Sequence, residues 1–348
     1  MSDSNCNKEM KNFHSEKVTL SKPDQTEMRD RRDNGRIRLE NGLERNGHAK
    51  PVDMQSQGSY AMHTMHQDDA NDYDIDDGVY FNESDLVDGI GNRLSPYHAR
   101  LRIATALEDK RLSEDATVKT NCVRQNYPQG YHIDIPVYRV VTSTDEHGQS
   151  GEFFELASGD DWVVSDSREV TRWYDSERSQ LNSNIPESGA DMAKVTRMTK
   201  FHGRSRDDWK KSTTSGICIT RLVVDHFQWC ENRLDSSLRK TWQEISNQLH
   251  QSLEIAHPVY DGKNLAEEYD VEVMFFRDRL DEALSELKVL DDPNCTRTKA
   301  RNAWDKVFDV TFFANQTEPT KESKGVSSSA FVVTTNDTAK RSEGDRFG

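Results

Sequence analysis

The sequence predicts an α+β fold whose C-terminal half is mostly helical, and three observations support this prediction. Short β-branched segments typical of strands surround one helical stretch: 78–81, 118–127 and 131–141 for the strands, and 95–110 for the helix. Beyond Gly159 the apolar residues follow helical spacing to about Phe313. From Asn315 the chain is rich in Ser, Thr, Lys and Glu, a composition that cannot form a packed core.

Composition limits the classes of protein to which the chain can belong. Only 33% of its 348 residues are hydrophobic, and 61 acids against 46 bases give a formal net charge of −15. Because nucleic-acid backbones bind basic surfaces, this balance disfavours a protein that coats genomic nucleic acid, although it permits a local basic pocket. No apolar run is long enough for a membrane span, and five scattered cysteines without a CxxC pair favour the cytoplasm.

The chain divides into four segments by composition and periodicity. We expect a flexible lead at 1–20, a long helix with the sheet core at 21–160, a helical domain at 161–314 and a disordered tail at 315–348. The long helix should begin at Ser21, with Pro23 in its first turn, and end near Asn46. The helical domain should contain helices at 167–181, 190–202, 215–230, 236–254, 264–290 and 296–313.

A pair of carboxylates within DYDIDDGVY is the first candidate for chemistry. On a strand, Asp74 and Asp76 point to the same face, with Ile75 on the opposite face. No Lys or Arg between residues 67 and 92 neutralises them, so either a proton or a bound divalent cation must offset their repulsion. An acidic solvated loop is the alternative interpretation of this pair.

Two further features favour the cation. Upstream, Gln57-Gly58-Ser59 could open a helix whose free backbone N–H groups bind phosphate. Downstream, Asp134 lies in the otherwise apolar segment HIDIPVY, where a buried acid needs a cation or a hydrogen-bond partner. A Gly-Ser turn, paired aspartates and a third strand aspartate are the parts that two-metal phosphoryl transfer needs, with two Mg²⁺ ions held by the acids.

These strings closely resemble the bacterial cGAS/DncV-like nucleotidyltransferases (CD-NTases), especially the branch typified by the dinucleotide cyclase of Vibrio. The resemblance covers about residues 53–310 and is strongest in QGSYAMHTM, DYDIDDGVYF and HIDIPVYRV. It implies a polymerase-β-like core followed by a C-terminal helical domain. It also implies that Asp74, Asp76 and Asp134 are the catalytic metal ligands, and that Gln57, Gly58 and Ser59 form the phosphate-binding turn.

The resemblance implies three more nucleotide-binding residues. Lys200, in KVTRMTK, matches a lysine that contacts the triphosphate, although a solvated basic stripe would show the same spacing. Ser215 matches a hydroxyl near the nucleotide, and it could equally cap the helix that follows. Arg124 matches an arginine that contacts the base, in a region where the surrounding residues diverge from the family.

The implied activity is a synthase that joins nucleoside triphosphates, expected to be ATP and GTP, into a cyclic di- or trinucleotide for antiphage defence (CBASS). Mg²⁺ is the expected cofactor, with Mn²⁺ as a substitute, and a nucleotide-activated effector is an expected partner. Two alternatives stay open: transfer to an RNA end or a small-molecule acceptor, which the negative net charge disfavours for RNA, and a nucleotide sensor without catalysis.

Other signals are weaker. His63 and His66 are separated by two residues and have no acids at ligand spacing, which predicts surface histidines. Cys218 and Cys230 are expected in the core, and no P-loop motif is present. The chain ends on Gly348, and related cyclases are joined to targets through their C-terminus by an E1/E2-like partner, so we hypothesise that Gly348 is a conjugation handle.

Overall fold

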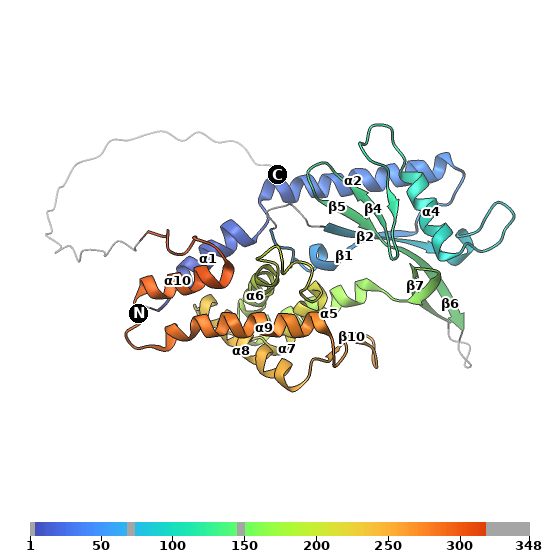
Figure 1. The fold of residues 1–348 in the computed structure, drawn as a ribbon. Coiled ribbons are helices and arrows are strands. Elements are labelled where there is room, and N and C mark those ends of the chain that lie inside the picture. Colours follow the sequence, from blue (N-terminus) through green and yellow to red (C-terminus); the bar gives the residue numbers. More distant parts are fainter. Residues whose placement is uncertain (1–3, 68–73, 145–149, 318–348) are drawn as a thin grey trace, which may run out of the picture. The chain divides into compact units, whose positions relative to one another are not determined.

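The computed structural model describes residues 4–67, 74–144 and 150–317 and confirms a mixed sheet flanked by helices (Figure 1). Contacts divide the chain into two units, Met1–Asn315 and Gln316–Gly348. The predicted tail from residue 318 and the predicted handle at Gly348 lie outside the described residues. No helix within the described residues is long and apolar enough to cross a membrane.

One large sheet forms the centre of the first unit. Its strands in the described residues are β1 Asp53–Gln57, β2 Asp74–Asn82, β3 Thr117–Val118, β4 Val123–Asn126, β5 His132–Ile135, β6 Val137–Thr144, β7 Ser150–Ser158 and β8 Asp161–Val164. The strand β2 is central, with β1 antiparallel on one side and β5 and β6 parallel on the other. The strand β8 lies beyond the predicted boundary at residue 160, so the sheet extends further along the chain than expected.

The strands β5 and β6 follow β2 with one constant register. Asp74 pairs with His132, and Val79 pairs with Val137, so the offset is the same in both strands. Pro136 separates the two strands because it has no N–H to donate, but its carbonyl still accepts from the Val79 N–H at 2.9 Å. The odd-numbered residues of β2 therefore face one side of the sheet and the even-numbered residues face the other.

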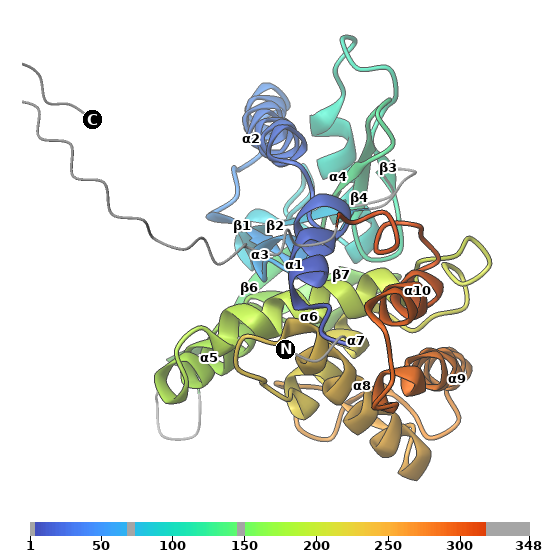
Figure 2. The same cartoon turned by 90° about the vertical axis from the view of Figure 1, so that its left-hand side faces the viewer.

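Two helices, α2 (Lys22–Arg45) and α4 (Pro96–Leu107), pack against the odd-numbered side of β2 (Figure 2). The predicted start of α2 is confirmed, because the Ser21 side chain accepts from the Asp24 N–H. The two helices approach very closely at Gly42, where an added Cβ would lie 1.8 Å from the Ala106 carbonyl oxygen. Only glycine permits this contact.

The C-terminal half consists mainly of helices around a second apolar cluster. The helices are α5 Ser167–Asn184, α6 Ser188–Gly203, α7 Gly216–His226, α8 Leu234–Gln251, α9 Val271–Glu286 and α10 Arg297–Phe308, with a short 3-10 helix at Leu287–Asp291. Another 3-10 helix, Glu83–Asp85, follows β2 in the N-terminal half. Trp242 and Trp304 are fully buried in the second apolar cluster. The helix expected at 264–290 begins later, because Asn264–Ala266 pairs as β10 with β9 (Ile255–Ala256).

The expected flexible lead is wrong for residues 4–20. This segment forms α1 (Asn7–Phe13) and a π-helical turn (His14–Val18), and its apolar side chains join the helical cluster. Phe13 is fully buried, and the rings of Phe201, Phe308, Phe312 and Phe313 contact it. Glu9 is buried as well and forms ion pairs with Arg297 and Arg301, which offset the cost of burying its charge.

We predict that Phe13→Ala destabilises the protein by about 3–5 kcal/mol, because it leaves a cavity among four aromatic rings. Chemical denaturation measures this loss. Lys11→Ala, at an exposed position of the same helix, is the control and should change the stability by less than about 0.5 kcal/mol. Equal midpoints for the two variants would mean that the N-terminal segment is not part of the folded core.

Candidate active site

The turn after β1 is held in place by Gln57. Its side chain is buried, donates to the Tyr80 hydroxyl at 2.9 Å and accepts from the Tyr138 hydroxyl at 3.1 Å. Gly78 leaves the necessary space, since an added Cβ there would lie 1.8 Å from the Gln57 amide nitrogen. The Gln57 side chain therefore takes part in a buried network beneath the turn, and its binding to nucleotide stays a prediction.

Gly58 and Ser59 open the short helix α3 (Gly58–Ala61) directly beside the acidic strand. Gly58 has a φ of +60°, and an added Cβ would lie 2.1 Å from Asp76 Oδ2. A side chain at this position would be strained and would also displace the carboxylate. The turn backbone and Asp76 are thus in contact, as the sequence-based interpretation of a phosphate-binding turn requires.

The register of β2 and β5 brings four polar side chains to one face of the sheet. Asp74 lies opposite His132, and Asp76 lies opposite Asp134, because the two strands are parallel and in register. Between them, Ile75 and Ile133 are buried on the opposite face. The structure therefore brings the three predicted aspartates together and adds His132, which we had not singled out.

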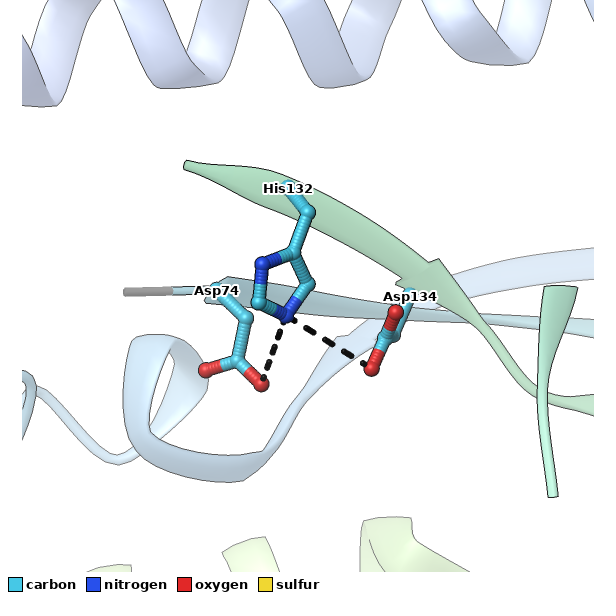
Figure 3. Close-up of side chains that lie close together, drawn as sticks. All are labelled: Asp74, His132 and Asp134. Carbon is cyan, nitrogen blue, oxygen red and sulfur yellow. Dashed lines mark ion pairs between the residues drawn. The ribbon is translucent and has the colours of Figure 1, made fainter. Parts of the chain in front are cut away.

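Three of these side chains form a candidate metal site (Figure 3). His132 Nε2 lies 3.8 Å from Asp74 Oδ2 and 3.9 Å from Asp134 Oδ2, and one ligand atom from each residue lies within 4.8 Å of the others. Carboxylates are the ligands that Mg²⁺ and Mn²⁺ prefer. The donor set therefore fits a divalent cation, with Asp76 on the adjoining position of the same face.

Arg124 forms an ion pair with one of the three aspartates. In β4 it lies opposite Asp134, and its guanidinium donates to both carboxylate oxygens at 2.7 Å. This bidentate pair directs the side chain to the acidic face, and the expected contact with a nucleotide base stays a prediction. Arg124 orients Asp134 and partly offsets the negative charge around it.

Burial and neighbouring charges shift the pKa values of Asp74 and Asp76. Burial and the neighbouring charges of Asp74 and Asp134 raise the pKa of Asp76 to about 8. Burial also raises the pKa of Asp74, against the lowering effect of His132. A cation bound at this face would reverse both effects, since it favours the ionised carboxylates. Without one, Asp76 holds a proton at neutral pH.

A cavity of about 510 Å³ separates the acidic face from the helices. Besides Gly58, Ser59, Asp74 and Asp76, its lining includes Met65, His66, Ser167, Lys200, Arg204, Lys210, Thr213, Thr214, Ser215 and Glu272. Lys200 comes from α6 and Ser167 from the start of α5, and the other basic and hydroxyl groups of this wall come from the segment between α6 and α7. This wall can bind phosphate oxygens, and the volume is in the usual range for small-molecule sites.

Lys200 is the most buried cation of this wall. Its side chain is 4% exposed, and its ammonium donates to the Thr64 hydroxyl at 2.9 Å. Burial lowers its pKa to about 7, with Asp74 acting in the opposite direction. The alternative of a solvated basic stripe is therefore wrong for Lys200. Because desolvation is costly, this ammonium gains from an anionic ligand in the cavity.

The helix cap predicted for Ser215 is confirmed, and its contact with a nucleotide stays a prediction. Its side chain accepts from the Cys218 N–H at 3.3 Å, which caps α7, and the residue also lines the cavity. Thr213 and Thr214 line it too, and no sequence signal had distinguished them. His66 was expected on the surface but lines the cavity, with its ring against Phe201. Cys218 is buried as expected, whereas Cys230 is only partly buried.

The N-terminal segment reaches this turn through Arg197 of α6. Arg197 Nε donates to His14 Nε2 at 2.9 Å, and its guanidinium also donates to the His63 carbonyl, just after the phosphate-binding turn. Burial and Arg197 lower the pKa of His14 to about 3, so the imidazole is neutral and can accept. The Arg197 side chain of α6 therefore contacts both the N-terminal segment 4–20 and the residues just after the phosphate-binding turn.

Comparisons with known proteins agree with this architecture. Residues 52–138 match the family described as "Cyclic GMP-AMP synthase DncV-like, nucleotidyltransferase domain", a segment that contains the turn and all three aspartates. Escherichia coli DncV with 3'-deoxy GTP has a TM-score of 0.66 at 17% identity, over 89% of this chain and 98% of that one.

Two further structures show the same likeness. Vibrio cholerae DncV cyclic AMP-GMP synthase, in complex with the linear intermediate 5' pppA(3',5')pG, has a TM-score of 0.67 at 16% identity, over 87% of this chain and 95% of that one. Bradyrhizobium diazoefficiens CD-NTase CdnG with GTP has a TM-score of 0.58 at 14% identity, over 87% and 98%. At these identities the likeness concerns the fold.

The fold and the matched segment define a nucleotidyltransferase. Within this class, residues 52–138 match the DncV-like nucleotidyltransferase domain, in agreement with the family that the sequence motifs resemble.

We predict that Asp76→Asn raises the Tm of the metal-free protein, and that the gain grows with pH. Between the ordinary pKa of 3.8 and the folded value of about 8, the unfolded chain is ionised while the folded chain keeps its proton. Rising pH therefore destabilises the wild type across this window and leaves the Asn variant unaffected. Each kcal/mol of destabilisation that the substitution removes should raise the Tm by about 2–4 °C.

Thermal unfolding in chelator at pH 5, 7 and 8.5 measures this effect. Asp161→Asn, at an exposed position of β8, is the control and should show no pH-dependent gain. A gain for Asp76→Asn that is the same at all three pH values would exclude a raised pKa at this position.

We also predict that Lys200→Ala raises the KM for nucleoside triphosphates about 10-fold or more and changes kcat much less. A charge-assisted hydrogen bond contributes about 1.5–3 kcal/mol to binding. In the wild type, KM should rise as the pH passes through about 7, because the free enzyme then loses the ammonium charge. Steady-state kinetics from pH 6 to 8.5 measure both effects.

Lys194→Ala is the matched control on the same helix, because Lys194 pairs with Asp191 and does not line the cavity. An unchanged KM in Lys200→Ala would show that this ammonium does not bind the triphosphate.

Proposed function

We propose that the chain joins nucleoside triphosphates, ATP and GTP, into a cyclic di- or trinucleotide. The observation that carries this proposal is one cavity with Asp74 and Asp76 on one wall and Lys200 on another. Cations held by the first wall and the ammonium of the second can surround a triphosphate from both sides. An RNA end would need a basic surface beyond the cavity, which a net charge of −15 disfavours.

Each transfer replaces one phosphorus–oxygen bond by another. A ribose hydroxyl of one nucleotide attacks the α-phosphorus of a second, and pyrophosphate leaves with the electrons of the broken bond. Two divalent cations, when bound, would lower the pKa of the attacking hydroxyl and offset the charge of the leaving pyrophosphate. For a cyclic dinucleotide, a second transfer within the linear product closes the ring and releases another pyrophosphate; a cyclic trinucleotide needs one more transfer and releases a third.

The chain's own residues would bind and orient the reactants. Asp74, Asp76 and Asp134 would hold the cations, with Arg124 fixing the orientation of Asp134. The Gly58–Ser59 turn would bind the terminal phosphates through its backbone, because Gly58 permits close approach. Lys200 would add positive charge from the helical wall.

The ligands in the similar structures support the choice of substrates. The Vibrio cholerae enzyme is a cyclic AMP-GMP synthase captured with a linear intermediate, and the Escherichia coli and Bradyrhizobium proteins were captured with guanine nucleotides. From the motif resemblance we also propose that the product is an antiphage signal that activates an effector. Conjugation at Gly348 by an E1/E2-like partner stays a prediction.

We predict that the protein, incubated with all four nucleoside triphosphates and Mg²⁺ or Mn²⁺, forms products that resist phosphatase. Mass spectrometry identifies the bases and the ring size, and a cyclic product has no terminal phosphate for phosphatase to remove. Linear, phosphatase-sensitive products would instead favour transfer to another acceptor. No consumption of any triphosphate would favour the nucleotide sensor.

Aspartate variants measured in the same assay test whether the acidic face binds the cations. Asp76→Asn and Asp134→Ala should lower the turnover to below about a tenth of wild type, because each removes a cation ligand. Asp161→Asn, an exposed acid away from the cavity, is the matched control and should retain full activity. A tenth or more of wild-type turnover in the first two variants would remove those residues from the cation site.

A further inference from the structure

The imidazole of His132 has an unusual environment for a core histidine. The residue is only 8% exposed, and its Nε2 has no hydrogen-bond partner within the described residues. Figure 3 shows Nε2 directed between the carboxylates of Asp74 and Asp134. A buried polar atom without a hydrogen bond is costly unless another group satisfies it.

The distances from His132 Nε2 to the two carboxylates favour a shared cation over a direct hydrogen bond. A charged imidazole that paired with either carboxylate would approach it to about 2.7–2.9 Å. Here Nε2 is 3.8 Å and 3.9 Å from the two nearest oxygens, which is too far for a hydrogen bond. Ligands of a cation with bonds of about 2.1 Å lie roughly 3.0–4.2 Å apart, from adjacent to opposite positions. Both distances lie within this range, so one ion can contact His132 together with either carboxylate, and the carboxylates, whose ligand atoms lie within 4.8 Å of each other, need at most a small approach to share it.

We propose that His132 is a nitrogen ligand of the divalent cation shared by Asp74 and Asp134, and that it biases this site toward transition metals over Mg²⁺. The proposal rests on the metal-dependent transfer proposed above. Imidazole binds transition metals well, whereas Mg²⁺ takes oxygen ligands and keeps its waters. A site built of carboxylates alone would lack this preference.

The strand around His132 supports its role as a ligand. Ile133 is buried on the opposite face, which fixes the side of β5 on which His132 and Asp134 lie. Arg124 holds both oxygens of Asp134, so this neighbouring ligand is oriented as well. Such supporting contacts are typical of metal sites.

Pulsed electron paramagnetic resonance of bound Mn²⁺ tests the proposal directly. The full chain is prepared with ¹⁴N-histidine or ¹⁵N-histidine, loaded with Mn²⁺ and measured without nucleotide, so that no base nitrogen contributes. We expect a nitrogen coupling that changes with the histidine isotope. The same coupling should be absent in His132→Asn and His132→Gln, and present in the control His98→Asn, at an exposed position of α4.

Affinity provides the second readout. His132→Asn should weaken Mn²⁺ binding about 10-fold or more and Mg²⁺ binding less than about 3-fold, because only the first ion benefits from the nitrogen. Bound Mn²⁺ without an isotope-sensitive coupling in the wild type would overturn the proposal, and so would a coupling that persists in both His132 variants. A clear coupling without any cyclic product would uphold this inference and overturn the proposed product.

Discussion

The parallel pairing of β2 with β5 and β6 is the constraint on which the site depends. Because the register is constant along both strands, Asp74, Asp76, His132 and Asp134 meet on one face while Ile75 and Ile133 pack on the other. A slip of one residue would exchange the two faces, so the apolar core that α2 and α4 cover also enforces the arrangement of the acids. Packing and chemistry are thus set by the same backbone hydrogen bonds.

The acidic face creates an electrostatic cost that the neighbouring elements reduce. Arg124 neutralises part of Asp134, and a proton remains on Asp76 because its pKa is about 8. Across the cavity, burial lowers the pKa of Lys200 to about 7, so this ammonium is only partly charged near neutral pH. Cations and a triphosphate would relieve both walls together, which makes the folded chain complementary to that pair of ligands.

Residues 4–20 are folded, although their polar composition and lack of periodicity predict a flexible segment. Phe13 enters a cluster of aromatic rings contributed from residues 201–313. The same segment contacts the phosphate-binding turn through Arg197. These partners are nearly 200 residues or more away in the sequence, so no local pattern could have indicated them. Tertiary contacts override local propensity in such segments.

Local periodicity and short motifs are enough to predict the α+β class, the start of α2, the strand alternation and the three aspartates of the acidic face. The spacing of His132 and Asp134 repeats that of Asp74 and Asp76, so His132 also had a signal in the sequence. The burial of Gln57 beneath its turn and the pairing of Arg124 with Asp134 became visible only in the folded chain. The tertiary structure also brought Lys200 opposite the acidic face. Side-chain partners depend on which strands and helices become neighbours, and that depends on contacts between residues far apart in the chain.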